Sequence, residues 1–305
     1  MLSVVITTWN EEKNLPRVLP SVKRLADEII VVDTQSTDKT VEIAKKFGCR
    51  VFHHQNTGIV EPVRNYSISK ARGDWILLMD ADEEISSGLA AYIKQVITTP
   101  GIDYYRLPRK NIIFGSWIKS EHWWPDYVYR LFRNGYVTWS PAVHSIPQTR
   151  GVGGDFPPEE KYAIIHHNYQ TVSQYVDRIN RYTDNQLQLL IDSGAVFSWK
   201  LLITKPSEEF FSQYFARNGY REGLHGLLLS GLQAFSELVL YAKYWQYLGF
   251  KPENIPPREF ILPVRRKISQ FQWWYYEKLV DKSPLVFRPF IRIIKDLSVI
   301  ISKFI

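Results

Sequence analysis

The first hundred residues alternate between short apolar runs and segments with helical spacing, and this alternation constrains the fold more than any other feature. We expect the apolar runs to form strands and the segments between them to form helices. The expected strands are residues 3–7, 28–33, 50–54 and 74–79, and the expected helices are residues 14–25, 37–47 and 63–71. Strand–helix units with continuously apolar strands predict a mostly parallel sheet with helices on both faces. The sequence therefore predicts a three-layer α/β fold.

Polar residues follow three of the expected strands. Residues 7–9 end the first strand, Asp33 ends the second, and Asp80 and Asp82 follow the fourth. Sheets of this kind bind ligands beyond the carboxyl ends of their strands. The sequence therefore predicts a ligand site where these three strand ends meet.

Both acidic strand ends have a functional and a structural interpretation. Asp80 and Asp82 are separated by one residue, so their carboxylates can converge on a divalent cation that neutralises a nucleotide diphosphate. Alternatively, Asp82 caps the following helix, with Glu83 and Glu84 beside its positive end. Asp33 either accepts the N3–H of a uracil or the hydroxyls of a ribose, or it is a turn residue.

The second hundred residues change character. Residues 103–146 are rich in aromatic and β-branched residues, which predicts antiparallel strands that cover the pocket. The glycine-rich stretch 151–158 predicts a flexible loop that acts as a lid or hinge. We therefore expect a catalytic domain over residues 1–200, divided into halves at residue 100, and a helical region over residues 201–305.

Six stretches of the chain form a recognisable set. They are SVVITTWNEEKNL (3–15), EIIVVDTQSTDKT (28–40), PVRNYSISKARGDWILLMDADEE (62–84), PDYVYRLFRNG (125–135), AVH (142–144) and HHNY (166–169). Together they resemble family 2 inverting glycosyltransferases with the GT-A fold, in particular the branch that includes lipopolysaccharide-core glucosyltransferases. This resemblance implies a Rossmann-like, mostly parallel sheet with an antiparallel extension on the acceptor side and a helical C-terminal region.

The resemblance also implies an activity and a set of site residues. It implies a metal-dependent, hexosyltransferase-like enzyme that moves a sugar from a nucleotide-diphosphate donor, with UDP favoured, to a glycan or lipid-linked acceptor. The residues implied for nucleotide binding are Thr7, Thr8, Trp9, Glu11, Asp33, Arg64 and Asp80. Asp82 and Asp80 are implied as ligands of Mg²⁺ or Mn²⁺. His166 is either a further ligand, a phosphate contact or a structural residue.

Inversion requires a carboxylate that deprotonates the acceptor hydroxyl as it attacks the anomeric carbon. In the branch that the chain resembles, the AVH segment continues to Glu, but here Ser145 follows His144. Asp126 is the replacement candidate, with Glu121 and His144 as alternatives. Asp126 also has a structural interpretation, an ion pair with Arg130. The Arg130 guanidinium either stabilises the leaving diphosphate or is a surface charge.

The positive charge of the chain is concentrated near its C-terminus. Residues 258–305 hold ten Lys and Arg against four Asp and Glu, within a net charge of +7 for the whole chain. Residues 271–276 and 284–305 mix these basic residues with aromatic and aliphatic ones, a pattern typical of helices at a membrane surface. The alternative is packing on the protein itself or on a dimer partner. The uncharged stretch 223–236 is too short to span a bilayer.

Location and competing functions follow from weaker signals. Met1 leads directly into the first strand and Cys49 is the sole cysteine, so we expect no signal peptide and a reducing compartment. We expect an enzyme of cell-envelope glycan or lipopolysaccharide-type biosynthesis in the cytoplasm, peripheral at the inner face of the membrane, with no nucleic-acid partner. The competing classes are a sugar nucleotidyltransferase, which normally has a glycine-rich phosphate loop, and a non-catalytic nucleotide-sugar-binding protein with a degenerate site.

Overall fold

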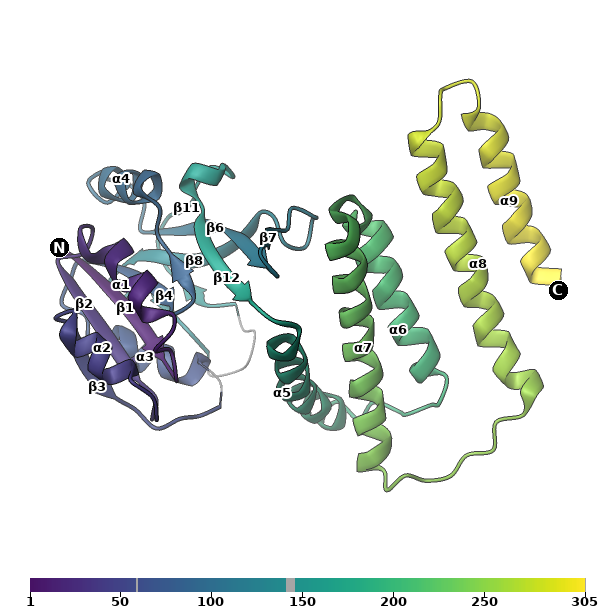
Figure 1. Cartoon of the computed structure of the whole chain (residues 1–305), viewed down its shortest axis with the longest axis horizontal. Helices are drawn as coiled ribbons and strands as arrows, with labels where there is room; N and C mark the ends of the chain where they lie inside the picture. Colours follow the sequence, from purple (N-terminus) through teal and green to yellow (C-terminus); the bar gives the residue numbers. More distant parts are fainter. Residues whose placement is uncertain (59, 141–145, 305) are drawn as a thin grey trace. The chain divides into compact units, whose positions relative to one another are not determined.

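The computed structural model describes residues 1–58, 60–140 and 146–304, with residues 298–304 as backbone only. The chain divides into two compact units (Figure 1). Unit 1 comprises residues 1–119 and 123–168, and unit 2 comprises residues 120–122 and 169–305. The helix α5 (Val172–Asp192) therefore belongs to unit 2, whereas the sequence predicts a catalytic domain that continues to residue 200.

Within the described residues, unit 1 is built on a ten-stranded sheet. Its order is β3-β2-β1-β4-β8-β6-β12-β5, and β7 and β11 pair with β6. The bounds are β1 (Leu2–Thr8), β2 (Glu28–Asp33), β3 (Arg50–His53), β4 (Trp75–Asp80), β5 (Glu83–Glu84), β6 (Tyr104–Ile113), β7 (Ser116–Trp117), β8 (Asp126–Arg133), β11 (Gly153–Asp155) and β12 (Ile164–Tyr169). The first four strands by number run parallel, whereas β8 pairs antiparallel with β4 and β6. A separate pair joins β9 (Val137–Thr138) to β10 (Gln148–Thr149).

Helices cover both faces of the parallel strands. On one face, Val4 and Ile6 pack in a core with α1 (Leu15–Lys23), α2 (Thr40–Lys46) and α4 (Ser87–Val96). On the other face, Val5 packs in a core with α3 (Glu61–Ile68). Successive side chains of a strand point to opposite faces, so apolar strands become buried on both sides. This arrangement confirms the predicted α/β class, a GT-A-type sheet with an antiparallel extension.

The glycine-rich stretch 151–158 differs from the predicted lid. Residues Gly153–Asp155 form β11 and pair with Tyr104–Arg106 of β6. A Cβ at Gly153 would overlap the Tyr104 ring, and Phe156 is buried. The glycines therefore allow the main chain to pack closely against an aromatic ring, and the stretch is part of the sheet.

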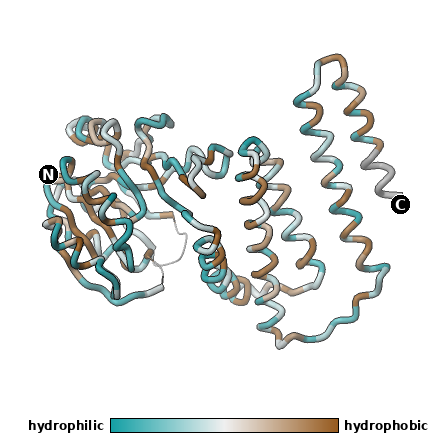
Figure 2. The backbone as a smooth tube through the Cα atoms, viewed as in Figure 1, coloured by the Kyte–Doolittle hydropathy of each residue, from teal (hydrophilic) through white to brown (hydrophobic). Residues whose placement is uncertain are grey.

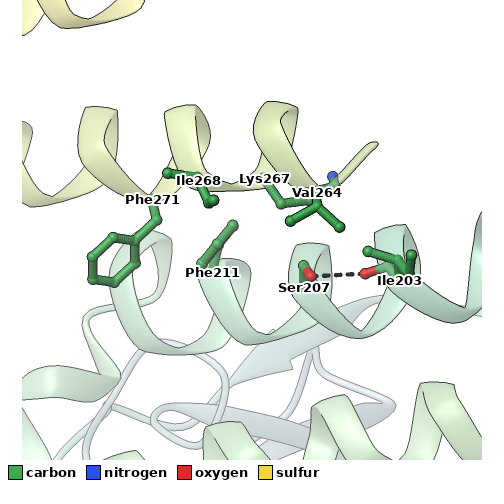
Figure 3. A pocket seen from close by; sticks show the side chains of 7 residues that line it. All are labelled: Ile203, Ser207, Phe211, Val264, Lys267, Ile268 and Phe271. Atoms are coloured by element: carbon green, nitrogen blue, oxygen red, sulfur yellow. Dashed lines mark hydrogen bonds between the residues drawn. The ribbon is translucent and has the colours of Figure 1, made fainter. Parts of the chain in front are cut away.

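Unit 2 is helical, as predicted for the C-terminal region. It contains α5, α6 (Leu201–Phe211), α7 (Gly223–Tyr247), α8 (Pro257–Lys282) and α9 (Arg288–Phe304). A cavity of about 270 Å³ lies between α6 and α8 and is lined mainly by apolar side chains such as Phe211, Val264 and Phe271 (Figure 3). Residues Gly219–Tyr247 form a helical segment that is long and apolar enough to cross a membrane, by length and composition, and 22% of its most apolar window is buried. From the uncharged residues 223–236 alone, the sequence predicts a segment too short to span a bilayer. The helix α7 extends beyond this stretch to Tyr247.

Candidate functional site

The polar strand ends of unit 1 meet at one edge of the sheet. Thr8 pairs with Asp33 across β1 and β2, and Thr7 pairs with Asp80 across β1 and β4. The loops that follow are joined by hydrogen bonds, since Ser36 Oγ accepts from the Asn10 main-chain N–H at 2.8 Å. Parallel register thus brings three predicted site segments together at the carboxyl edge, as expected for this type of sheet.

Asp33 is buried with an acceptor left unsatisfied. The residue is only 2% exposed to solvent. Its Oδ2 accepts a hydrogen bond from the Ser36 main-chain N–H at 3.2 Å. Its Oδ1 is buried and has no hydrogen-bond partner within the described part of the chain. A buried unpaired acceptor is costly, so the site is suited to a ligand that supplies a donor. The interpretation of Asp33 as a turn residue explains the hydrogen bond to Oδ2 but not the buried, unpaired Oδ1.

Asp80 lies between two arginines. Arg64 Nη2 donates to its Oδ1 at 3.1 Å, and Arg130 Nη2 donates to its Oδ2. Burial alone would raise the pKa of the Asp80 carboxyl, but Arg130, Arg64 and Arg109 outweigh burial and hold that pKa far below its usual range. Asp80 is therefore a fixed negative charge that orients Arg64 and Arg130.

Arg130 is a buried cation with two carboxylate partners. It also donates to Oε1 of Glu83, which is 0% exposed, at 2.7 Å. Its Nε is buried without a hydrogen-bond partner among the described residues. The surface-charge interpretation of Arg130 is therefore wrong, because this guanidinium is enclosed within unit 1.

Asp126 pairs with Arg109, not with Arg130. Arg109 Nε and Nη2 both donate to Asp126 Oδ2, at 2.9 and 2.6 Å. The two residues lie directly opposite one another in the antiparallel register of β6 and β8. Asp126 and Arg130 are four residues apart on one strand, which separates them by about 13 Å along it. The predicted ion pair between Asp126 and Arg130 is therefore wrong. Arg109 also lies within 3.5 Å of the Glu83 carboxylate.

Asp82 faces His166. Asp82 Oδ2 lies 3.5 Å from His166 Nε2, and His166 is buried. The helix-cap interpretation of Asp82 is wrong, because Ser86 caps α4 by accepting from the Leu89 N–H at 3.1 Å. The neighbouring histidine, His167, points to the other face and contacts Glu84 at 3.1 Å.

The Asp82–His166 pair fits a divalent cation. Two ligand atoms that each lie about 2.1 Å from one ion are separated by roughly 3.0–3.5 Å. Among the described residues no group of three or more His, Cys, Asp or Glu is arranged to hold a metal. An ion held by Asp82 and His166 would complete its coordination with oxygens from a bound ligand or water.

Glu11, which follows β1, interacts with Asp82 and Asp80. Burial raises the pKa of the Glu11 carboxyl from 4.5 to about 7; a hydrogen bond from Asn14 opposes the rise, and Asp82 and Asp80 add to it. Thr7 Oγ1 lies 3.0 Å from Ser67 Oγ, and Trp9 is largely exposed. A cation near Asp82 would relieve the repulsion among these acids.

Some site residues were missed and some lie elsewhere. Arg109 and Asn111 join the predicted residues but are not named in the sequence prediction, and Glu83 is named there only as a charge beside the start of a helix. Arg109 and Asn111 are two apart on β6, so they share a face, and this spacing was the available signal. Glu121 belongs to unit 2, where its carboxylate accepts from Asn218 Nδ2 at 2.7 Å. His144 and Ser145 lie outside the described residues.

Comparison with known proteins matches part of the chain to a family. Residues 3–147 match the family model for glycosyl transferase family 2. This match to glycosyl transferase family 2 covers just under half of the chain. The chain is 29% identical over 263 residues to an uncharacterized glycosyltransferase of Rickettsia typhi, an alignment that covers 83% of this chain and 89% of the relative.

Two further similarities extend the comparison. The lipopolysaccharide core biosynthesis glycosyltransferase LpsC of Rhizobium meliloti is 23% identical over 260 residues, which cover 82% of this chain and 94% of LpsC. A crystal structure of glucosyl-3-phosphoglycerate synthase from Mycobacterium tuberculosis with Mn²⁺, UDP and glucosyl-3-phosphoglycerate aligns at 25% identity with a TM-score of 0.30. That alignment covers 38% of this chain and 44% of the synthase.

Proposed function

We propose that this protein is a family 2 glycosyltransferase that moves a sugar from a UDP-sugar to a glycan or lipid-linked acceptor, with inversion, in cell-envelope glycan or lipopolysaccharide-type biosynthesis. The observation that carries the nucleotide assignment is the unpaired, buried Asp33 Oδ1 at a strand end. The N3–H of uracil is a donor of the required kind. Thr7, Thr8, Trp9 and Glu11 lie at or just after the end of the neighbouring strand β1 and are proposed to contact the base and ribose.

Asp82 and His166 are proposed to hold Mg²⁺ or Mn²⁺. The bound cation would neutralise the charge of the departing diphosphate. Asp80, with both oxygens engaged by arginines, would orient Arg64 toward the nucleotide phosphates rather than act as the main metal ligand. Arg130 is then a positioning residue that holds Asp80.

Asp126 is proposed as the catalytic base. Its Oδ2 accepts three hydrogen bonds, two from Arg109 and one from Asn111. The carboxylate is therefore held in one orientation while its side chain stays partly exposed, at 26%. In the proposed step the acceptor oxygen bonds to the anomeric carbon, the bond from that carbon to the diphosphate breaks, and the acceptor proton passes to Asp126.

Donor hydrolysis tests this function. Each of several UDP-, GDP- and dTDP-sugars is incubated with the full chain, with and without Mn²⁺, and Asp82→Asn serves as the variant. We expect metal-dependent release of UDP from one donor, reduced at least about 100-fold in Asp82→Asn. If no donor reacts, a thermal shift with UDP and Mn²⁺ separates a non-catalytic nucleotide-binding protein, which shifts, from a protein without a nucleotide site.

Unit 2 is proposed to place the enzyme at the inner face of the membrane. The turn between α8 and α9 carries Leu285, Val286 and Phe287, which are 59–76% exposed, and Phe290 in the first turn of α9 is 65% exposed. Turns are usually polar, so an exposed apolar turn indicates an interaction surface. Lys282 and Arg288 flank it, and Figure 2 shows apolar residues recurring along α8 and α9. This pattern suits an anionic lipid surface, and a lipid-linked acceptor would be available there.

Vesicle flotation tests the membrane assignment. We expect the full chain to float with phosphatidylcholine vesicles that contain phosphatidylglycerol, and less with phosphatidylcholine alone. The triple variant Leu285→Ser, Val286→Ser and Phe287→Ser should remain in solution. Val196→Ser is the control, because Val196 is an 86% exposed apolar side chain of unit 2 outside the turn. Equal flotation of all three proteins would exclude the turn as the contact.

A further inference from the structure

Asn111 is fully buried, and its side-chain amide contacts both His166 and Asp126. Its Nδ2 donates to the Trp123 main-chain oxygen at 3.0 Å and to Asp126 Oδ2 at 3.1 Å. Its Oδ1 lies 2.6 Å from His166 Nδ1. One side chain therefore contacts the proposed metal ligand, the proposed base and the main chain beside it.

These contacts determine the orientation of the amide. A main-chain carbonyl oxygen can only accept, so the atom that faces Trp123 must be the amide nitrogen. The atom that faces His166 is then the amide oxygen, which also can only accept. The hydrogen between Asn111 and His166 must therefore belong to His166 Nδ1.

The tautomer of His166 follows from this orientation. In a neutral imidazole with its proton on Nδ1, Nε2 carries the lone pair. That lone pair faces Asp82 Oδ2 at 3.5 Å, so two acceptors oppose each other. Such a pair is stable when a cation lies between or beside the two atoms.

We infer that Asn111 is a positioning residue that fixes His166 in the Nδ1–H tautomer and so presents Nε2, with Asp82, to a divalent cation before any ligand binds. This inference rests on the proposed metal role of His166 and deepens it. A hydrogen-bond partner of this kind fixes the ring orientation of a metal-binding histidine and raises its basicity. Because the same amide donates to Asp126, the metal ligand and the base share one rigid connection through β6.

The test begins with the unaltered, metal-free protein. Two-bond ¹H–¹⁵N spectra of the imidazoles, with His166→Gln used to assign the signals, are recorded at a pH where the ring is neutral. We expect a protonated Nδ1 and an unprotonated Nε2. The opposite tautomer would overturn the inference, and this measurement needs no folded Asn111 variant.

Asn111→Leu then tests whether the amide matters for the metal. We expect its Mn²⁺ affinity, measured by electron paramagnetic resonance, to fall 10- to 100-fold and its His166 tautomer to change. Asn111→Asp keeps an acceptor for Nδ1–H and should keep the tautomer. Asn65→Leu is the control, since Asn65 bridges the main chain of Trp139 and contacts neither ligand. An unchanged tautomer and affinity in Asn111→Leu would overturn the inference.

The failure of the proposed function would look different. If the Nδ1–H tautomer and the Asn111-dependent Mn²⁺ affinity are found while no nucleotide sugar reacts, glycosyl transfer is refuted and the role of Asn111 stands. If a donor reacts while His166 has its proton on Nε2, the proposed function stands and the role of Asn111 is refuted.

Discussion

Glu83→Gln should destabilise unit 1 because it removes the central charge of a buried network. Glu83 is 0% exposed and contacts Arg130 at 2.7 Å and Arg109 at 3.5 Å. Its Oε2 also accepts the main-chain N–H of Asp80 at 2.9 Å. Removing one partner of a buried ion pair costs about 3–5 kcal/mol. Glutamine has the same shape and keeps one acceptor, so we expect the lower end, about 3 kcal/mol.

Amide hydrogen exchange measures this loss within unit 1 alone. A peptide that spans β4 reports the opening of the central sheet, and about 3 kcal/mol corresponds to more than a 100-fold acceleration of exchange. Glu160→Gln is the matched control, because Glu160 pairs with Lys110 at the surface and its loss should leave exchange in β4 unchanged. Equal protection in Glu83→Gln and the unaltered chain would refute the reasoning that this network stabilises unit 1.

Three further predictions follow from single features. Asp33→Ala should weaken UDP binding in calorimetry roughly 10- to 100-fold, because a hydrogen bond to a charged acceptor is lost; unchanged affinity would remove Asp33 from the nucleotide site. The pKa of Glu11 is about 7 in the folded protein and 4.5 in the unfolded chain, so the folded protein holds this proton to a higher pH. The metal-free protein should therefore lose at most about 3 kcal/mol of stability as pH rises between these values, and Glu11→Gln should flatten that slope in urea titrations. In α7, Gly226→Ala would overlap the Gly219 main-chain oxygen and lower the melting temperature, whereas Gly231→Ala meets nothing within 4 Å and should raise stability by about 1 kcal/mol; like shifts in both would contradict this packing.

The sequence predicts the parallel half of unit 1 well for a physical reason. Apolar strands buried on both faces are recognisable from composition, and parallel register then places their last residues side by side. This is why Asp33 and Asp80 lie at one edge, as predicted. The bounds of β2, Glu28–Asp33, agree with the predicted strand.

Contacts between distant segments could not be predicted in the same way. The Arg109–Asp126 pair depends on the register of β6 and β8, which shifts at Tyr105 and Arg106. The role of Asp82 depends on β5, whose Glu83 pairs with His166 of β12. With Glu83 and Glu84 in a strand, the N-cap of α4 lies at Ser86, which no local pattern around Asp82 indicates.

Five charged side chains of unit 1 that are buried or partly buried form a series in which each member contacts the next: Asp80, Arg130, Glu83, Arg109 and Asp126. A substitution at one position leaves its neighbours with an uncompensated charge in the interior. During divergence, single changes here should therefore be removed by selection, while paired changes that restore the balance persist. The series would behave as one inherited unit, so that a relative lacking Glu83 is expected to lack Arg130 as well.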